Sequence, residues 1–349
     1  GGGQMVASSL GVELLCQIPI NQPIHHVSLY ESDEKIGQIY DDIADLIIKN
    51  KDKISEVYFT FGIQSSGRDA KLVNGGLIPV IGLSKQLEDL RRLSEAGIPL
   101  NLLFNANCYG ANARSKALFK NIDADINYVK EHFSIQAVTT TSPLIAKFIK
   151  NHYPDLDVRA SVNIGIGSIC AADAVADVFD SFYIKRELNR NFKVLQELRT
   201  WCNQNDKQMY LLANSGCLND CPVTIFHNNL VAHSHEIATK DNSYSFGQLC
   251  NTYLRKKDKQ QAIFTDTNFI CPEDIHLYEG LVPAMKLATR VTPYYEEIIQ
   301  TYLSGDYSDN FMKLLEPPHD QDLLPFVWNN QTVISKVEDE KLKYFPISI

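Results

Sequence analysis

The chain has 349 residues, of which 44% are hydrophobic and 21% charged, and its 33 basic and 42 acidic side chains give a formal charge of −9. This composition is typical of a globular protein with a large core, and its acidic balance argues against broad, phosphate-driven binding of nucleic acid. No apolar run approaches the roughly 18 residues of a membrane-spanning helix. The N-terminus lacks a basic region followed by an apolar one, so we expect no signal peptide and a cytoplasmic location.

Short apolar runs that are typical of buried strands alternate with segments of helical periodicity along the chain. Strands are predicted at residues 12–18, 57–62, 100–104, 137–140, 158–163, 182–185, 209–213 and 285–288. Helices are predicted at residues 34–49, 84–96, 113–133, 171–178, 190–203 and 292–303, and another is expected to begin at Pro143. Two short pieces, 263–265 and 269–271, are expected to be extended.

Eight strands with intervening helices predict an α/β fold, a (β/α)8 barrel of the TIM type. We expect the barrel to span residues 10–305 and an irregular C-terminal extension, 306–349, to pack on its surface. A doubly wound sheet is the alternative. Such a sheet usually opens with a glycine-rich loop after its first strand, and Gln17-Ile18-Pro19-Ile20 contains no glycine.

Polar side chains follow most of the predicted strands. A barrel places its chemistry at the carboxyl ends of its strands, so these side chains are candidates for ligand binding. The candidates are Arg68, Asn105, Asn107, Lys185, Arg190, Asn214, Lys286 and Arg290. Five of them are cations. They indicate a site for a ligand that carries carboxylates, which guanidinium groups bind through two hydrogen bonds.

The stretch from Met209 to Glu236 combines a predicted strand with soft metal ligands directly after it. It contains Cys217, Cys221, His227, His233 and His235. A radical cluster of the C-x3-C-x2-C type is disfavoured because Thr224 stands at the third position. Zinc would use the two cysteines with two of the histidines. An iron–sulfur cluster would use four thiolates, which are Cys217, Cys221, Cys250 and Cys271.

Four stretches of the chain resemble the collagenase-like peptidase family, also called peptidase family U-32. They are Val57-Tyr58-Phe59-Thr60-Phe61-Gly62 with Arg68 downstream, Phe104-Asn105-Ala106-Asn107-Cys108, Ala213-Asn214-Ser215-Gly216-Cys217-Leu218-Asn219-Asp220-Cys221-Pro222, and Met285-Lys286-Leu287-Ala288-Thr289-Arg290. The last is similar to the family's Leu-Lys-Ile-Glu-Gly-Arg strand but has Ala288 and Thr289 in place of glutamate and glycine. The similarity covers roughly residues 10–305.

The resemblance implies a barrel with a [4Fe–4S] cluster on Cys217, Cys221, Cys250 and Cys271. Several branches of the family act in oxygen-independent hydroxylation, in ubiquinone biosynthesis and RNA modification, and prephenate is associated with them as an oxygen donor. Our leading hypothesis is therefore an iron–sulfur-dependent oxidoreductase that hydroxylates a small molecule or a peptide without molecular oxygen. The three histidines are expected to pack beside the cluster.

Two other functions stay open. One is a peptidase of the U-32 type, although His233-Ser234-His235-Glu236 lacks the His-Glu-x-x-His order of a metallopeptidase. The other is a non-catalytic, cluster-bearing subunit that assembles with a related barrel. The resemblance does not identify the substrate or the electron donor.

Overall fold

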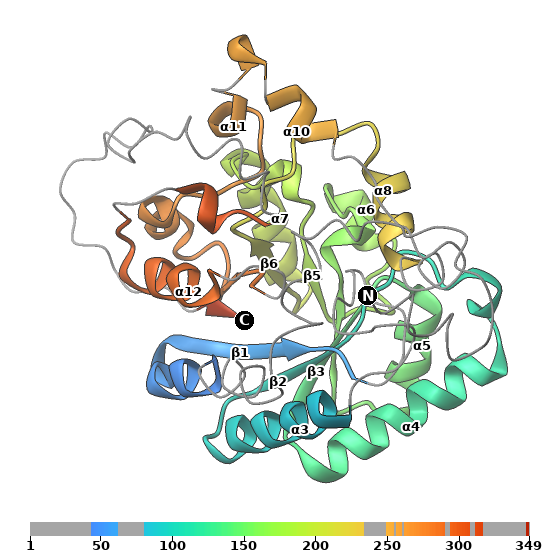
Figure 1. The fold of residues 1–349 in the computed structure, drawn as a ribbon. Helices are drawn as coiled ribbons and strands as arrows, with labels where there is room; N and C mark the ends of the chain where they lie inside the picture. The colour runs from blue at the N-terminus through green and yellow to red at the C-terminus, as the bar shows by residue number, and fades with distance from the viewer. Residues whose placement is uncertain are drawn as a thin grey trace, which may run out of the picture.

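Eight parallel strands form the centre of the protein. The computed structural model describes residues 43–61, 80–233, 249–254, 256–259, 262–289, 294–307, 311–316 and 347–348. The strands are β1 Ile54–Phe59, β2 Leu100–Phe104, β3 Ile135–Thr140, β4 Asp157–Ala160, β5 Ser181–Tyr183, β6 Gln208–Leu212, β7 Met285–Lys286 and β8 Ile347–Ser348. Each strand pairs with the next in sequence, and β8 pairs with both β7 and β1, so the order closes into a barrel (Figure 1).

The helices follow the strands along the chain, and α3, α4 and α5 lie along the outside of β1, β2 and β3 in Figure 1. The α-helices are α3 Val80–Glu95, α4 Lys116–His132, α5 Pro143–His152, α6 Ile169–Asp173, α7 Phe192–Gln204, α8 Thr224–Ala232, α10 Leu249–Leu254, α11 Ala262–Thr265 and α12 Tyr295–Ser304. Short 3-10 turns are η2 Lys51–Lys53, η3 Gly110–Asn112, η4 Val162–Ile164, η5 Arg186–Leu188, η6 Lys257–Lys259, η7 Pro272–Tyr278 and η8 Phe311–Leu314.

The prediction of an α/β fold built on a parallel sheet is confirmed. Seven of the eight predicted strands correspond to β1 to β7, and the eighth, residues 12–18, lies outside the described residues. The sequential order of the described strands excludes the doubly wound alternative, in which the order reverses within the sheet. The full eightfold alternation of strand and helix stays a prediction, because the described strand that closes the order is the two-residue β8 from the C-terminal end.

Most helices lie close to the positions predicted from the sequence, and capping residues mark several of their ends. Ser115 and Ser142 accept hydrogen bonds from the first turns of α4 and α5, and α12 ends at Gly305 in the left-handed conformation. Two predictions were wrong. α3 begins at Val80 rather than at residue 84, and residues 263–265, expected to be extended, belong to the helical turn α11.

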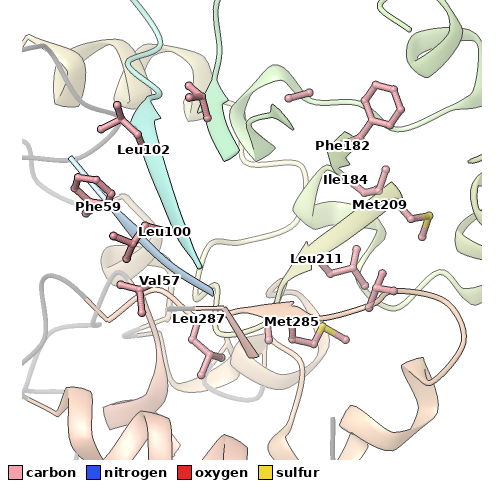
Figure 2. Packing of buried hydrophobic residues seen from close by; sticks show 14 of the residues in the cluster. Val57, Phe59, Leu100, Leu102, Phe182, Ile184, Met209, Leu211, Met285 and Leu287 are labelled. Carbon is pink, nitrogen blue, oxygen red and sulfur yellow. The ribbon is translucent and has the colours of Figure 1, made fainter. Parts of the chain in front are cut away.

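The apolar core lies between the strands and the helices. Figure 2 shows labelled side chains of this layer from successive strands, among them Val57, Leu100 and Met209. These residues alternate along their strands with polar ones such as Glu56 and Asn101, which are also buried. Successive side chains of a strand point to opposite faces, so the apolar face of the sheet packs on the helices and the polar face lines the barrel interior.

Residues 314–316, near the C-terminal end of the described chain, are buried. Leu314 and Leu315 are completely buried, and Glu316 pairs with Ser215 in a parallel bridge. The predicted division into a barrel, 10–305, and an extension packed on it, 306–349, stays a prediction. Among the described residues, no helix is long and apolar enough to cross a membrane, and the cytoplasmic location stays a prediction.

Candidate functional site

The loops after β4, β5 and β6 meet around the Arg186 side chain. Its Nη1 donates a hydrogen bond to Cys217 Sγ at 3.2 Å, and its Nη2 donates to Asn163 Oδ1. Asn163 follows β4, Arg186 follows β5 and Cys217 follows β6, so all three lie at the carboxyl ends of parallel strands. Arg186 comes directly after a predicted strand, but it was not among the cations that the sequence proposed to bind the ligand.

The positive charge of Arg186 also acts on His227. It lies on α8, is half-buried, and follows Cys221 by six residues. Burial and the neighbouring positive charge of Arg186 both lower the pKa of His227. A histidine with a lowered pKa is neutral at physiological pH and can accept a proton.

A paired segment fixes the chain that contains Cys217. Leu218 and Thr267 form an antiparallel bridge, and the Asn268 N–H donates to the Cys217 carbonyl oxygen at 2.9 Å. Arg190 holds this segment from the other side, because its guanidinium donates to the carbonyl oxygens of Thr267 at 2.7 Å and Phe269 at 2.8 Å. Arg190 therefore holds the segment from Thr267 to Phe269 in place. Its contact with a substrate stays a prediction.

Asn214 joins three segments that are distant in sequence. Its Nδ2 donates to the carbonyl oxygens of Ala288 at 2.8 Å and Leu314 at 3.0 Å, and the Ala288 N–H donates to its Oδ1 at 2.7 Å. The Asn214 side chain is completely buried. It therefore holds the loops after β6 and β7 and the segment at Leu314 in place relative to one another. A direct contact of Asn214 with substrate stays a prediction.

Lys286 lies inside the barrel rather than on its outer rim. Its Nζ lies 3.5 Å from the ring centroid of Tyr58 and 4.8 Å from that of Tyr183, which are cation–π distances. Below it, Glu56 accepts hydrogen bonds from Arg159 at 2.8 Å and Asn101 at 3.1 Å. This buried network joins residues of β1, β2, β4, β5 and β7, and it was not predicted from the sequence.

The remaining candidates lie at other strand ends. The aliphatic part of Lys185 packs on Gly167, where an added Cβ would come within 2.5 Å of Lys185 Cε. Asn105 and Asn107 are half-buried in the loop after β2, and the Asn107 Oδ1 has no hydrogen-bond partner within the described residues. Gly110, in the same loop, has a φ of +54° and faces His233 at the end of α8. Arg68, Arg290 and His235 lie outside the described residues.

The four cysteines of the expected cluster lie in loops and short helices. Cys217 and Cys221 follow β6, Cys250 is on α10, and Cys271 precedes η7; all four are half-buried free thiols. Burial, with help from Asp274 and Glu273, raises the pKa of Cys271 to about 12. Within the described residues, no three histidine, cysteine, aspartate or glutamate side chains are grouped closely enough to hold a metal ion.

The fold and its loops define a parallel α/β barrel-like protein with polar groups and thiols at the carboxyl ends of the strands. No family model matches the chain. An uncharacterized protease of Methanocaldococcus jannaschii is 27% identical over 233 residues, which cover 64% of this chain and 65% of that protein. The match thus spans slightly less than two thirds of the length of this relative.

Solved structures of similar shape include the U32 peptidase Mk0906, with a TM-score of 0.45, 14% identity, and coverage of 56% of this chain and 74% of that one. An α-amylase from Lactobacillus plantarum and an endo-β-1,4-mannanase from Thermotoga petrophila each have a TM-score of 0.34 and 10% identity, and cover 54% and 60% of this chain and 61% and 63% of their own. The likeness to this uncharacterized protease is in line with the resemblance to the U-32 peptidase family. The particular branch of the family stays a prediction.

Proposed function

We propose that the chain is an enzyme that hydrolyses peptide bonds, as a peptidase of the U-32 type, with its reaction centre at Cys217. The observation that carries this proposal is the hydrogen bond from Arg186 to the Cys217 thiol at the carboxyl ends of β5 and β6. A cation beside a partly exposed cysteine is the environment of reactive thiols. The similarity to an uncharacterized protease supports the same class of reaction.

A mixed peptide library tests this proposal when cleavage is followed by mass spectrometry. The wild-type chain is expected to cleave some of the peptides, and Cys217→Ala is expected to lower the rate by at least about 100-fold, because the nucleophile is lost. Cys170→Ala is the matched control, since Cys170 is an exposed thiol on α6, and it should keep the wild-type rate. An absence of any cleavage by the wild-type chain would overturn the peptidase assignment.

A second candidate is an enzyme that uses a [4Fe–4S] cluster for oxygen-independent hydroxylation, with prephenate as a possible oxygen donor. The pairing of Leu218 with Thr267 favours it, because the pairing brings the chain at Cys217 next to the segment that leads to Cys271. Metal binding requires deprotonated thiols, and burial raises the pKa of Cys271. The described cysteines do not form a ready ligand group, so we derive no reaction step through a cluster or through zinc.

The other predictions about this protein concern its partners. A peptide or a small molecule as substrate agrees with both candidates, and assembly with a related barrel subunit stays a proposal. Bulk binding of nucleic acid remains disfavoured by the formal charge of −9.

A further inference from the structure

The loop after β4 lies against the chain that leaves β5. Ile166 and Ile184 form a parallel bridge, and the Lys185 N–H donates to the Ile166 carbonyl oxygen at 2.8 Å. The loop begins with the short turn η4, where the Ser161 side chain accepts a hydrogen bond from the Asn163 N–H. These contacts hold the loop in a fixed position beside the carboxyl end of β5.

Arg186 extends from the end of β5 onto this loop. Its Nη2 donates to Asn163 Oδ1, and its Nη1 donates to Cys217 Sγ at 3.2 Å. The two contacts fix the direction of the planar guanidinium. A guanidinium has further N–H donors besides these two, so Arg186 keeps donors for a ligand.

Lys185 reaches the same loop through the aliphatic part of its side chain. A Cβ built on Gly167 would lie 2.5 Å from Lys185 Cε and 2.7 Å from its Cδ, so a larger residue at this position would displace the lysine chain. The φ of Gly167 is not left-handed, so the backbone itself does not require glycine there. The two cations therefore contact one short loop, Arg186 at Asn163 and Lys185 at Gly167.

No carboxylate in the described part of the chain forms an ion pair with either of these two cations. Glu187, the next residue, pairs with neither of them, whereas Lys150 forms an ion pair with Asp180 at 2.6 Å. Lys185 and Arg186 are both half-buried. Two such cations in a chain with a formal charge of −9 indicate a site for an anionic ligand.

We propose that Lys185 and Arg186 together bind a carboxylate of the substrate, and that Gly167 is a positioning residue that lets the lysine lie across the loop. This inference rests on the proposed peptidase function and names its substrate class, which is peptides with a carboxylate close to the cleaved bond. A guanidinium binds a carboxylate through parallel hydrogen bonds, and a lysine ammonium adds a compact positive charge.

The contact between Arg186 and Cys217 limits the distance from the carboxylate to the cleaved bond. A carboxylate on the same guanidinium lies within about two residues of the Cys217 sulfur, since an extended residue spans about 3.3–3.6 Å. Two carboxylates of a peptide meet this condition. One is the terminal carboxylate of a peptide that is shortened from its end, and the other is an acidic side chain beside the cleaved bond.

Three matched peptides test the site and distinguish these two sources. They are N-acetyl-alanyl-aspartyl-alanine, its C-terminal amide, and the same acid with asparagine in place of aspartate. Calorimetry with the Cys217→Ala chain measures their dissociation constants, and mass spectrometry measures their cleavage by the wild-type chain. The first peptide is expected to bind about tenfold more tightly than at least one of the other two, because a charge-assisted pair is lost with the carboxylate.

Substitutions in the loop and at the cations test which residues produce this preference. Lys185→Met should weaken binding of the first peptide about tenfold, and Arg186→Met should weaken it at least as much. Gly167→Ala should cause the same loss as Lys185→Met, with little change in urea unfolding, because the end of a lysine chain moves easily. Lys193→Met is the matched control, since Lys193 is exposed on α7, and it should keep the wild-type affinity.

A double variant separates positioning from a general effect on structure. If Gly167 acts through Lys185, Gly167→Ala should change the affinity by less than about twofold in a chain that already carries Lys185→Met. A further tenfold loss in that background would overturn the positioning role. Urea unfolding of each variant identifies any loss of affinity that comes from an unfolded chain.

The outcomes separate this inference from the proposed function. Equal binding of the three peptides, or a preference that survives both Lys185→Met and Gly167→Ala, overturns the carboxylate site. Weaker binding of the amide assigns the terminal carboxylate, and weaker binding of the asparagine peptide assigns the side chain; either result supports the site. A preference that depends on Lys185 in a chain that cleaves no peptide keeps the carboxylate site and overturns the peptidase function.

Discussion

Replacing Arg159 with methionine is expected to lower the free energy of unfolding by about 3–5 kcal/mol, because the change leaves the Glu56 carboxylate buried without its cation. The two side chains are only 9% and 8% exposed, and their closest atoms are 2.8 Å apart. Burial opposes the charge on Arg159, but Glu56, Tyr183 and Asp157 outweigh burial and raise the pKa of the guanidinium. Urea denaturation at neutral pH measures the loss.

A surface arginine provides the control for this variant. Arg91 forms an ion pair with Glu95 on α3, and the two side chains are 56% and 62% exposed. Arg91→Met is expected to change the free energy of unfolding by no more than about 0.5 kcal/mol, because solvent screens exposed pairs. If Arg159→Met lowers the free energy of unfolding by less than about 1 kcal/mol, the buried pair of Arg159 and Glu56 does not stabilise the barrel as we expect.

Asn214→Ala is expected to cost about 3 kcal/mol, the second-largest effect on stability. The alanine would leave the N–H and carbonyl of Ala288 and the carbonyl of Leu314 without the partners that Asn214 provides, and all of these residues are buried. Each buried polar group that loses its partner costs roughly 1–3 kcal/mol. The midpoint and slope of urea unfolding, followed by tryptophan fluorescence, measure this effect.

Asn205→Ala is the matched control for Asn214→Ala. Asn205 also donates from Nδ2 to a carbonyl oxygen, that of Trp201 at 2.8 Å, but it lies exposed at the end of α7. Water replaces its hydrogen bond, so the expected cost is below about 1 kcal/mol. Equal costs for the two variants would show that Asn214 does not join the segments after β6 and β7 in solution.

The order of the strands could be predicted from the sequence because their signals are local. Apolar runs such as 100–104 and 209–213 mark strands by their composition, and β2 and β6 occupy the predicted positions. β8 could not be predicted, because two residues carry no periodicity and its pairing with β1 and β7 is a long-range contact. Residues 263–265 have high strand propensity but form a helical turn, since tertiary contacts override weak local preference.

The sequence contains a pattern that indicates the polar interior of the barrel. β1 reads Ile-Ser-Glu-Val-Tyr-Phe and β4 reads Asp-Val-Arg-Ala, so residues with polar groups stand at alternate positions, Glu56 and Tyr58 in β1 and Asp157 and Arg159 in β4. Successive side chains point to opposite faces, so this alternation predicts one apolar and one polar face. The identity of the ion pair, Glu56 with Arg159, joins residues 103 positions apart and required the structure.

The candidate site was predicted in its position but only partly in its contacts. Cys217 and Asn214 lie at the carboxyl end of β6, as the barrel prediction required. Arg190 and Asn214 form hydrogen bonds with main-chain carbonyls of distant segments, and residue type alone cannot distinguish that role from ligand binding. Arg186 is one of several cations that follow predicted strands, and the sequence gives no reason to prefer it over the others. Its contact with Cys217 is visible only in the structure.

A native mass spectrum of the anaerobically purified chain, recorded after mixing with an activated peptide ester, tests most directly whether Cys217 is the centre of a hydrolytic reaction. We predict a mass increase equal to one acyl group, located on the fragment that contains Cys217 and absent from Cys217→Ala. The contradicting result is a chain without an acyl adduct whose extra mass is that of a [4Fe–4S] cluster and is lost when Cys217 or Cys250 is replaced by alanine.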